Sequence, residues 1–263
     1  MMTPSGADIE SLQKLIARVV AMHPAGRNLM LIGGFRYRYL DHSVRVSDDI
    51  DYHWNGDLYQ KQSELTALFK RALLPEVGRT LGYDGNVLPG SGPESESPVL
   101  RIIELAFWKQ DVPRSRVEIP VEITRIVCAD RVEVRTAEGT LYATVSDADM
   151  IESKVIAILN RRFLKHRDIV DLFLFQDKLR SDSGQRLLAK MAGLEIPTSS
   201  AIKRIEDLRS NTSYHERAIQ AVIDSQLERA AADQLNDASG GKLVLSTAVE
   251  LLSKLIGGSH ESS

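Results

Sequence analysis

Hydrophobic positions in the first half of the chain follow two different periods. Residues 9–22 place apolar side chains at three- and four-residue steps, which predicts a helix packed on a core by one face. Residues 29–32 are a short apolar run that ends at Gly33-Gly34, which predicts a buried strand and a tight turn. The pattern then predicts a helix over 35–40 and a strand over 49–54. This half therefore has the pattern of a mixed α/β structure.

The middle of the chain predicts one more helix and a pair of strands. Residues 58–81 have the helical period, and Pro75 predicts an end or a kink there. Residues 84–98 are rich in Gly, Pro, Ser and Glu, a composition that predicts a mobile loop. Strand-like runs over 100–108 and 116–127 predict a hairpin through residues 109–115. Pro120 predicts a bulge or an edge position, because proline cannot donate to a strand ladder.

From Asp147 onward the sequence carries only the helical period. The helices are expected at residues 150–164, 168–179, 183–192, 199–208, 215–231 and 243–256. We therefore predict an α/β (α+β) core over 1–146, a helical domain over 147–258 and a disordered tail over 259–263.

Composition narrows the choice of compartment and partner. With 33 Lys+Arg against 36 Asp+Glu, the formal net charge of -3 gives no global reason to expect a polyanionic partner, so any contact with nucleic acid must come from a local patch. The single cysteine, Cys128, lies in an apolar stretch and favours a reducing compartment. We find no secretory signal and no run of 18 apolar residues, which predicts a soluble, cytoplasmic protein with no membrane contact.

Two aspartates stand out as candidate metal ligands. Asp49 and Asp51 are separated by one residue, so on a strand both side chains point to the same face. Carboxylate oxygens hold Mg²⁺, which neutralises phosphate charge in phosphoryl and nucleotidyl transfer. The Gly33-Gly34 turn upstream lets backbone amides approach a phosphate closely. Taken alone, an Asp-x-Asp pair is more often a polar strand face, and a Gly-Gly pair an ordinary turn. Their order along the chain is what favours metal-dependent nucleotidyl or phosphoryl transfer.

A third carboxylate is expected from a neighbouring strand. Glu118 and Glu122 both follow on the β-rich run, four residues apart, and share a face if that strand is regular. A bulge at Pro120 would remove one of them from the shared face. Glu118 is the preferred ligand and Glu122 its competitor.

The segment 154–172 is the second informative stretch. On a continuous helix, Lys154, Arg161, Lys165 and Asp168 would lie within about 60° of one another. The opposite side would be apolar, formed by Val155, Ile156, Leu159, Phe163 and Val170. A basic, solvated helix face is the ordinary explanation of this pattern.

In order, these elements resemble the polymerase-β-like nucleotidyltransferase superfamily and, within it, the AbiEii/AbiGii nucleotidyltransferase toxin family. The resemblance covers about residues 29–175. Gly33-Gly34 with Arg36 is similar to the first half of motif one, and Ser47 to Asp51 to its second half. Arg116-x-Glu118 is similar to a second motif whose usual residue is lysine, and residues 154–171 to a long basic motif.

The resemblance implies a polymerase-β-like core with a mixed sheet, followed by a C-terminal helical lobe. It implies transfer of a nucleotide from a nucleoside triphosphate to a macromolecule, with the 3′ end of tRNA favoured and a protein hydroxyl second. It further implies two magnesium ions and the toxin role of a type IV toxin–antitoxin or abortive-infection system, with a cognate antitoxin as a possible partner.

Site residues follow from the motifs and the resemblance together. The catalytic residues would be Asp49, Asp51, Lys154 and Asp168. The nucleotide would be bound by Gly33, Gly34, Arg36, Ser47, Lys154, Arg161 and Arg167, and the metal by Asp49, Asp51 and Glu118. Asp171 would support the helix or the metal shell.

The distance between Lys154 and Asp168 limits how the basic segment 154–172 can fold. In one unbroken helix, Lys154 and Asp168 would be about 21 Å apart along the axis, too far to contact the same phosphate. We therefore predict a helix break between Asn160 and His166, which would fold Asp168 back toward Lys154. Without a break, only one of the two residues would be catalytic.

Two other functional classes stay open at this stage. The first is a non-catalytic binding module that keeps the nucleotidyltransferase fold. The second is a metal-dependent hydrolase, whose usual histidine-rich signature is missing, because His42, His53, His166 and His215 have no ligand-like spacing.

Overall fold

The computed structural model describes residues 6–90 and 99–257. The chain forms two compact units. The first contains the residues up to Ile126 together with Val132–Val145, and the second contains Val127–Arg131 together with the residues from Ser146 onward. A mixed sheet dominates the first unit and helices the second, as the sequence predicts.

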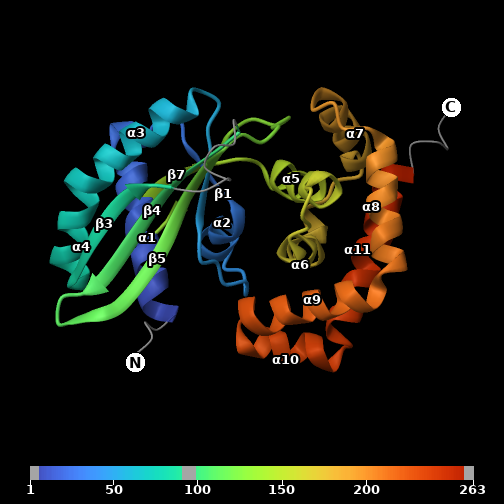
Figure 1. Ribbon diagram of the computed structural model, residues 1–263. Coiled ribbons are helices and arrows are strands. Elements are labelled where there is room, and N and C mark those ends of the chain that lie inside the picture. Colours follow the sequence, from blue (N-terminus) through green and yellow to red (C-terminus); the bar gives the residue numbers. More distant parts are fainter. Residues whose placement is uncertain (1–5, 91–98, 258–263) are drawn as a thin grey trace. The chain divides into compact units, whose positions relative to one another are not determined.

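The first unit is built on a seven-stranded sheet with the order β3-β4-β5-β2-β1-β7-β6 (Figure 1). Its strands are β1 (Met30–Ile32), β2 (Ile50–His53), β3 (Tyr83–Pro89), β4 (Leu100–Lys109), β5 (Val112–Thr124), β6 (Glu133–Ala137) and β7 (Thr140–Thr144). The pairs β1–β7 and β2–β5 are parallel, and the other neighbours are antiparallel. The predicted mixed sheet is therefore confirmed.

Helices of the first unit cover one face of the β3–β4–β5 part of this sheet (Figure 1). The unit contains α1 (Gly6–Met22), the 3₁₀ turn Pro24–Gly26, α2 (Gly33–Leu40), α3 (Leu58–Leu68), the π-helical turn Phe69–Leu73 and α4 (Leu74–Leu81). The core between α1, α3, α4 and the sheet includes Ile103, Phe107 and Ile119, all fully buried. Because side chains alternate along a strand, Glu118 and Glu122 of β5 lie on the opposite face.

The predicted mobile loop over 84–98 is wrong for its first part. Residues Tyr83–Pro89 form β3, an antiparallel partner of β4, and Val87 is fully buried in the core. Composition alone misses this strand, because its apolar positions alternate with polar residues that face away from the core. Residues 91–98 lie outside the described part of the chain.

Pro120 lies within a continuous β5. The register shift between β4 and β5 falls between Phe107 and Lys109, so Pro120 creates no bulge. Pro120 pairs with Glu104 of β4, and pairing with β2 starts only at the next residue, Val121. The edge interpretation therefore fits, since β5 has no described strand on its β2 side before Val121.

A second hairpin, β6–β7, was not predicted from the sequence. Its two-residue turn, Glu138-Gly139, has φ values of 47° and 75°, the left-handed geometry that tight hairpins require. The Glu-Gly pair and the alternation in the flanking residues were the available signals.

The regular elements of the second unit within the described residues are helices. Its helices are α5 (Asp147–Asn160), α6 (His166–Leu174), α7 (Ser183–Gly193), α8 (Thr198–Ser210), α9 (Thr212–Gln226), α10 (Arg229–Asp237) and α11 (Gly240–Gly257), with a 3₁₀ turn at Gln176–Lys178. The single helix predicted over 215–231 is instead divided at Leu227–Glu228 between α9 and α10. No helix in the described residues is long and apolar enough to cross a membrane.

A buried ion network explains why residues 127–131 belong to the second unit. The Asp149 carboxylate of α5 accepts hydrogen bonds from the backbone N–H of Ala129 and Asp130, each at 2.9 Å. Lys190 of α7 lies 2.6 Å from the same carboxylate, and Arg186 joins Asp149 to Asp130. Burial would raise the pKa of Asp149, but Lys190 and the two N–H groups hold it below its ordinary value. No local sequence pattern predicts this network.

Candidate metal and nucleotide site

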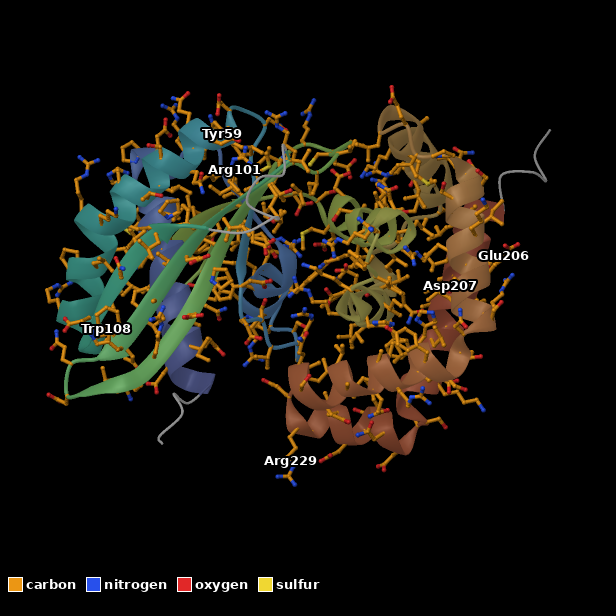
Figure 2. All side chains as sticks on the ribbon, in the orientation of Figure 1. Tyr59, Arg101, Trp108, Glu206, Asp207 and Arg229 are labelled. Carbon is orange, nitrogen blue, oxygen red and sulfur yellow. The ribbon has the colours of Figure 1, made fainter. Side chains whose placement is uncertain are left out.

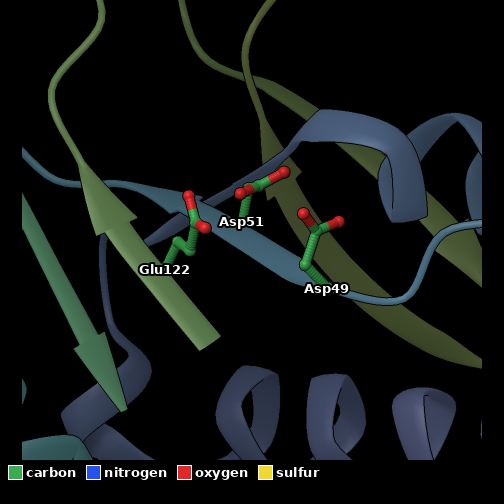
Figure 3. Close-up of side chains that lie close together, drawn as sticks. All are labelled: Asp49, Asp51 and Glu122. Carbon is green, nitrogen blue, oxygen red and sulfur yellow. The ribbon is translucent and has the colours of Figure 1, made fainter. Parts of the chain in front are cut away.

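Asp49, Asp51 and Glu122 form an acidic cluster on the face of the sheet opposite the core (Figure 3). One ligand oxygen from each carboxylate lies within 4.8 Å of the other two. Asp49 immediately precedes β2 and is buried, whereas Asp51 and Glu122 are half-buried. Ile50 and Tyr52, the alternate residues, are buried in the core. The alternation expected for Asp-x-Asp on a strand is therefore present.

The third carboxylate of this cluster is Glu122, which corrects the preference for Glu118. The parallel pairing of β2 and β5 places Asp51 opposite Glu122. Glu118 lies four residues earlier on β5, about 13 Å away along a regular strand. Its side chain is 68% exposed and forms an ion pair with Arg116 at 2.8 Å.

Gly33 and Gly34 form the start of α2 directly beside the acidic cluster. Gly33 has φ +76°, and a Cβ atom there would lie 1.8 Å from Oδ2 of Asp51. A Cβ atom on Gly34 would lie 2.7 Å from the Ser47 hydroxyl. Only glycine therefore fits these two positions while Asp51 and Ser47 keep their places. The N-terminus of α2 points backbone N–H groups and a positive dipole end outward, which favours an anionic group nearby.

Ser47 orients the first aspartate. Its hydroxyl donates a hydrogen bond to Oδ1 of Asp49 at 2.7 Å. Gln13 of α1 donates to the backbone oxygen of Ser47, also at 2.7 Å, which fixes the segment that precedes β2. Ser47 therefore acts on Asp49, and a direct contact with a nucleotide stays a prediction.

Arg36 does not fit the predicted contact with a nucleotide. Its side chain has no exposed surface and lies between α2 and the β6–β7 hairpin. Its Nε donates to the Thr144 hydroxyl at 3.2 Å, and its guanidinium pairs with Asp41, which also pairs with Arg135. The guanidinium thus joins α2 to the sheet.

A cavity of about 470 Å³ adjoins the acidic cluster on the same sheet face. Its floor lies on β3, β4 and β5 and contains the apolar side chains of Leu88, Ile102 and Trp108. Glu122 is the last residue of β5 that lines it, so the cavity and the cluster share this carboxylate. Glu118, the ligand preferred from the sequence, lines this cavity as well.

The second unit brings the predicted basic residues together as the reach argument requires. Helix α5 ends at Asn160 and α6 begins at His166, which confirms the predicted break. Lys154 Nζ lies 3.0 Å from Oδ1 of Asp168 and 3.0 Å from Oδ2 of Asp171, and Arg161 pairs with the other oxygen of Asp168.

Asp168 is therefore a partner of cations in the interior of the second unit. Burial would raise its pKa, but the Lys154 ammonium and the Arg161 guanidinium hold it below its ordinary value. Its carboxylate is 1% exposed, so it orients Lys154 and Arg161. Direct contact of Asp168 with reacting atoms is not supported by this burial. Arg167 is half-buried, and its role at a nucleotide stays a prediction.

Among residues 6–90 and 99–257, the Asp49–Asp51–Glu122 group is the one cluster of three or more potential metal-ligating side chains. No histidine belongs to it. His166 and His215 are hydrogen bonded to each other at 2.9 Å. The hydrolase alternative therefore gains no histidine-rich centre.

No protein-family model and no curated protein matches the chain. Solved structures do. A candidate nucleotidyltransferase of Helicobacter pylori matches with a TM-score of 0.58 at 13% identity, over 99% of this chain and 100% of the other. The protein JHP933 of Helicobacter pylori matches with a TM-score of 0.55 at 15% identity, over 99% and 97%. The nucleotidyltransferase toxin MenT4 of Mycobacterium tuberculosis matches with a TM-score of 0.52 at 18% identity, over 73% of this chain and 64% of that one. The chain therefore has a nucleotidyltransferase fold.

Proposed function

We propose that this chain is a metal-dependent nucleotidyltransferase, which transfers a nucleoside monophosphate from a nucleoside triphosphate to a hydroxyl group of a macromolecule. The observation that carries the proposal is the convergence of Asp49, Asp51 and Glu122 beside the Gly33-Gly34 start of α2. A nucleotidyltransferase needs both parts, namely a cluster of carboxylates and an adjacent phosphate-binding turn.

The chemistry of the three side chains fits Mg²⁺. All three offer hard carboxylate oxygens, and their mutual distances of 4.8 Å or less allow shared ions. Two bound magnesium ions would neutralise the triphosphate and stabilise the attacking and leaving oxygens. Ser47 holds Asp49 in the orientation that such binding requires.

Strand order supports binding of the two substrates on opposite sides of the cluster. Nucleotidyl transfer places the attacking oxygen and the leaving pyrophosphate in line across the α-phosphorus. Gly33 and Gly34 follow β1, on one side of β2, where backbone N–H groups favour the triphosphate. Glu122 and the cavity over β3–β5 lie on the other side, so the acceptor hydroxyl approaches from there.

In this arrangement Glu122 is the carboxylate nearest the acceptor and receives the proton of its hydroxyl group. The acceptor oxygen forms a bond to the α-phosphorus, the bond from that phosphorus to the bridging oxygen breaks, and pyrophosphate leaves.

For the acceptor and the biological role, we propose the 3′ end of an RNA, with tRNA favoured over a protein hydroxyl, and a toxin of the AbiEii type with a cognate antitoxin. The fold shared with MenT4, a nucleotidyltransferase toxin, supports this choice. The basic residues Lys154, Arg161 and Arg167 of the second unit supply the cations for a triphosphate in the same proposal.

Labelled nucleoside triphosphates test the proposal. The full chain, Mg²⁺ and each α-³²P-labelled triphosphate are incubated with total RNA and separately with total protein, and label is followed on gels. We expect label on RNA, with loss of about a hundredfold or more in Asp49→Asn. Transfer by Asp49→Asn at the wild-type rate contradicts the proposed metal site. If neither triphosphates nor Mg²⁺ bind the wild-type chain in calorimetry, the binding-module alternative replaces the enzyme.

A further inference from the structure

Phe163 is the most exposed large apolar side chain in the described part of the chain, with 76% of its surface accessible. It lies in the connection between α5 and α6, at residues 161–165. The helical period placed Phe163 on the apolar side of one long helix, a prediction that the helix break overturns. A single exposed apolar side chain is ordinary on a protein surface, so what distinguishes Phe163 is the charge of its neighbours.

Basic residues flank Phe163 in the sequence, and one of them lies against its ring. Residues 160–167 contain four Arg or Lys and no acidic residue, in a chain whose formal net charge is -3. The Arg162 guanidinium lies 5.2 Å from the centre of the Phe163 ring. Arg162 and Lys165 form no ion pair with any described residue, which leaves their charge available to an external anion. This is the local basic patch that the composition of the whole chain does not reveal.

Contacts hold both ends of the connection. At its second end, the backbone N–H of Asp168 donates a hydrogen bond to the backbone oxygen of Lys165 at 2.9 Å, and Arg161 makes the contacts at its first end. The backbone oxygen of Arg161 accepts a hydrogen bond from Arg204 of α8. The Arg161 side chain pairs with the buried Asp168, which Lys154 of α5 also binds. Phe163 is therefore presented from a fixed loop, which reduces the entropy that a ligand must remove on binding.

We propose that residues 161–165 bind a single-stranded polynucleotide, with one base stacked on Phe163 and the neighbouring phosphates paired with Arg162 and Lys165. An accessible aromatic ring among cations fits both parts of such a strand, because bases stack on rings and phosphates bind arginine and lysine. Binding rests on the loop alone. The identification of the bound strand as the nucleotide acceptor rests on the proposed function.

Fluorescence anisotropy with labelled oligonucleotides of about 12 residues tests the proposal on the full chain, in EDTA and without triphosphate. We expect Phe163→Ala to weaken binding of single-stranded RNA about tenfold or more, with recovery in Phe163→Trp and not in Phe163→Leu. The matched control is Ile202→Ala, which removes another apolar side chain of the second unit that is 46% exposed. Arg162→Gln should reduce the slope of log affinity against log salt by about 0.7.

Equal affinity of Phe163→Ala and the wild type overturns the proposal, as does full affinity in Phe163→Leu or tighter binding of a duplex. Parallel measurements on single-stranded DNA distinguish RNA from DNA as the ligand, since both offer bases and phosphates. Similar affinity for the two supports stacking without recognition of the ribose. Asp49→Asn distinguishes this proposal from the proposed function. It should bind RNA like the wild type, whatever its transfer activity.

Discussion

Replacing Glu122 with glutamine removes one of three negative charges from the acidic cluster and keeps the size of the side chain. Each pair of carboxylates is within 4.8 Å. At that distance, the repulsion between two charges is about 1 kcal/mol in water and about 3 kcal/mol at an effective dielectric constant near 20. Glu122→Gln removes two of the three pairs. The figure for water is a lower bound for these partly buried groups, so the metal-free variant should be more stable than the wild type by at least about 2 kcal/mol.

With magnesium the stability advantage of Glu122→Gln should become smaller. Suppose that Glu122→Gln binds Mg²⁺ tenfold more weakly than the wild type, and that the Mg²⁺ concentration is about 100 times the wild-type Kd. The bound ion then stabilises the variant by about 1.4 kcal/mol less than it stabilises the wild type. For a chain of this size, the increase in Tm on addition of Mg²⁺ should therefore be about 3–5 °C smaller in the variant than in the wild type. The variant should therefore have a higher Tm in EDTA and a smaller increase on addition of Mg²⁺.

Differential scanning fluorimetry over a Mg²⁺ titration measures both effects, with Ca²⁺ as a second hard cation. The control is Glu118→Gln, since Glu118 occupies the same strand and the same face but pairs with Arg116 at the surface. It should change Tm by about 1–2 °C at most under both conditions. If Glu118→Gln removes the response to Mg²⁺ and Glu122→Gln keeps it, the assignment of the third carboxylate from the strand register is refuted.

Two further predictions follow from single contacts. Gly33→Ala should abolish the response of Tm to Mg²⁺ and destabilise the fold by more than about 1 kcal/mol, because its Cβ would displace Asp51. The control is Gly139→Ala, since Gly139 has φ +75° and no atom within 4 Å of a Cβ. This control should show only the backbone cost of about 1 kcal/mol and keep the response to Mg²⁺. Asp168→Asn should lose about 3 kcal/mol at pH 7 in urea unfolding, since Arg161 loses its buried partner and Lys154 keeps only Asp171. The pKa of Asp168 lies below its ordinary 3.8 in the folded chain, so its contribution is complete above that value and is lost as the pH falls through the folded pKa. The difference between Asp168→Asn and the wild type should therefore shrink below about pH 4, and a constant difference down to pH 2 would contradict the assigned ion pairs.

Most helices and the strands near the site could be predicted from the sequence, because each has a local pattern. The helix break between Lys154 and Asp168 could be predicted for a different reason. A known rise per residue showed that one helix could not bring the two side chains together, and the structure places them 3.0 Å apart across the break. Chain geometry, combined with a functional requirement, thus predicted a feature that periodicity alone contradicts.

The features that were missed depend on neighbours that are distant in sequence. The motif pattern assigns Arg36 to a nucleotide, whereas Thr144 and Asp41 bind its guanidinium in a fully buried position. Thr144, which accepts the hydrogen bond of the Arg36 Nε, is 108 residues away, although the ion-pair partner Asp41 is only five residues away. Similarly, β3 is a strand because β4 supplies its hydrogen bonds, and its own composition is that of a loop. Neither partnership is encoded in a local period.

Local sequence pattern does not distinguish Glu118 from Glu122 as the third carboxylate. Both residues have the same face of β5, similar spacing from Asp51 in sequence and the same chemistry. What separates them is the register of the parallel β2–β5 pair, which sets Asp51 opposite Glu122. A slip of four residues in that register would move a carboxylate by about 13 Å, beyond the reach of an ion held by Asp49 and Asp51. Parallel register is fixed by packing of the buried alternate residues, such as Ile50 against the core, and not by any signal within β5 itself. The residue that completes the metal site is therefore selected by the core on the opposite face of the sheet.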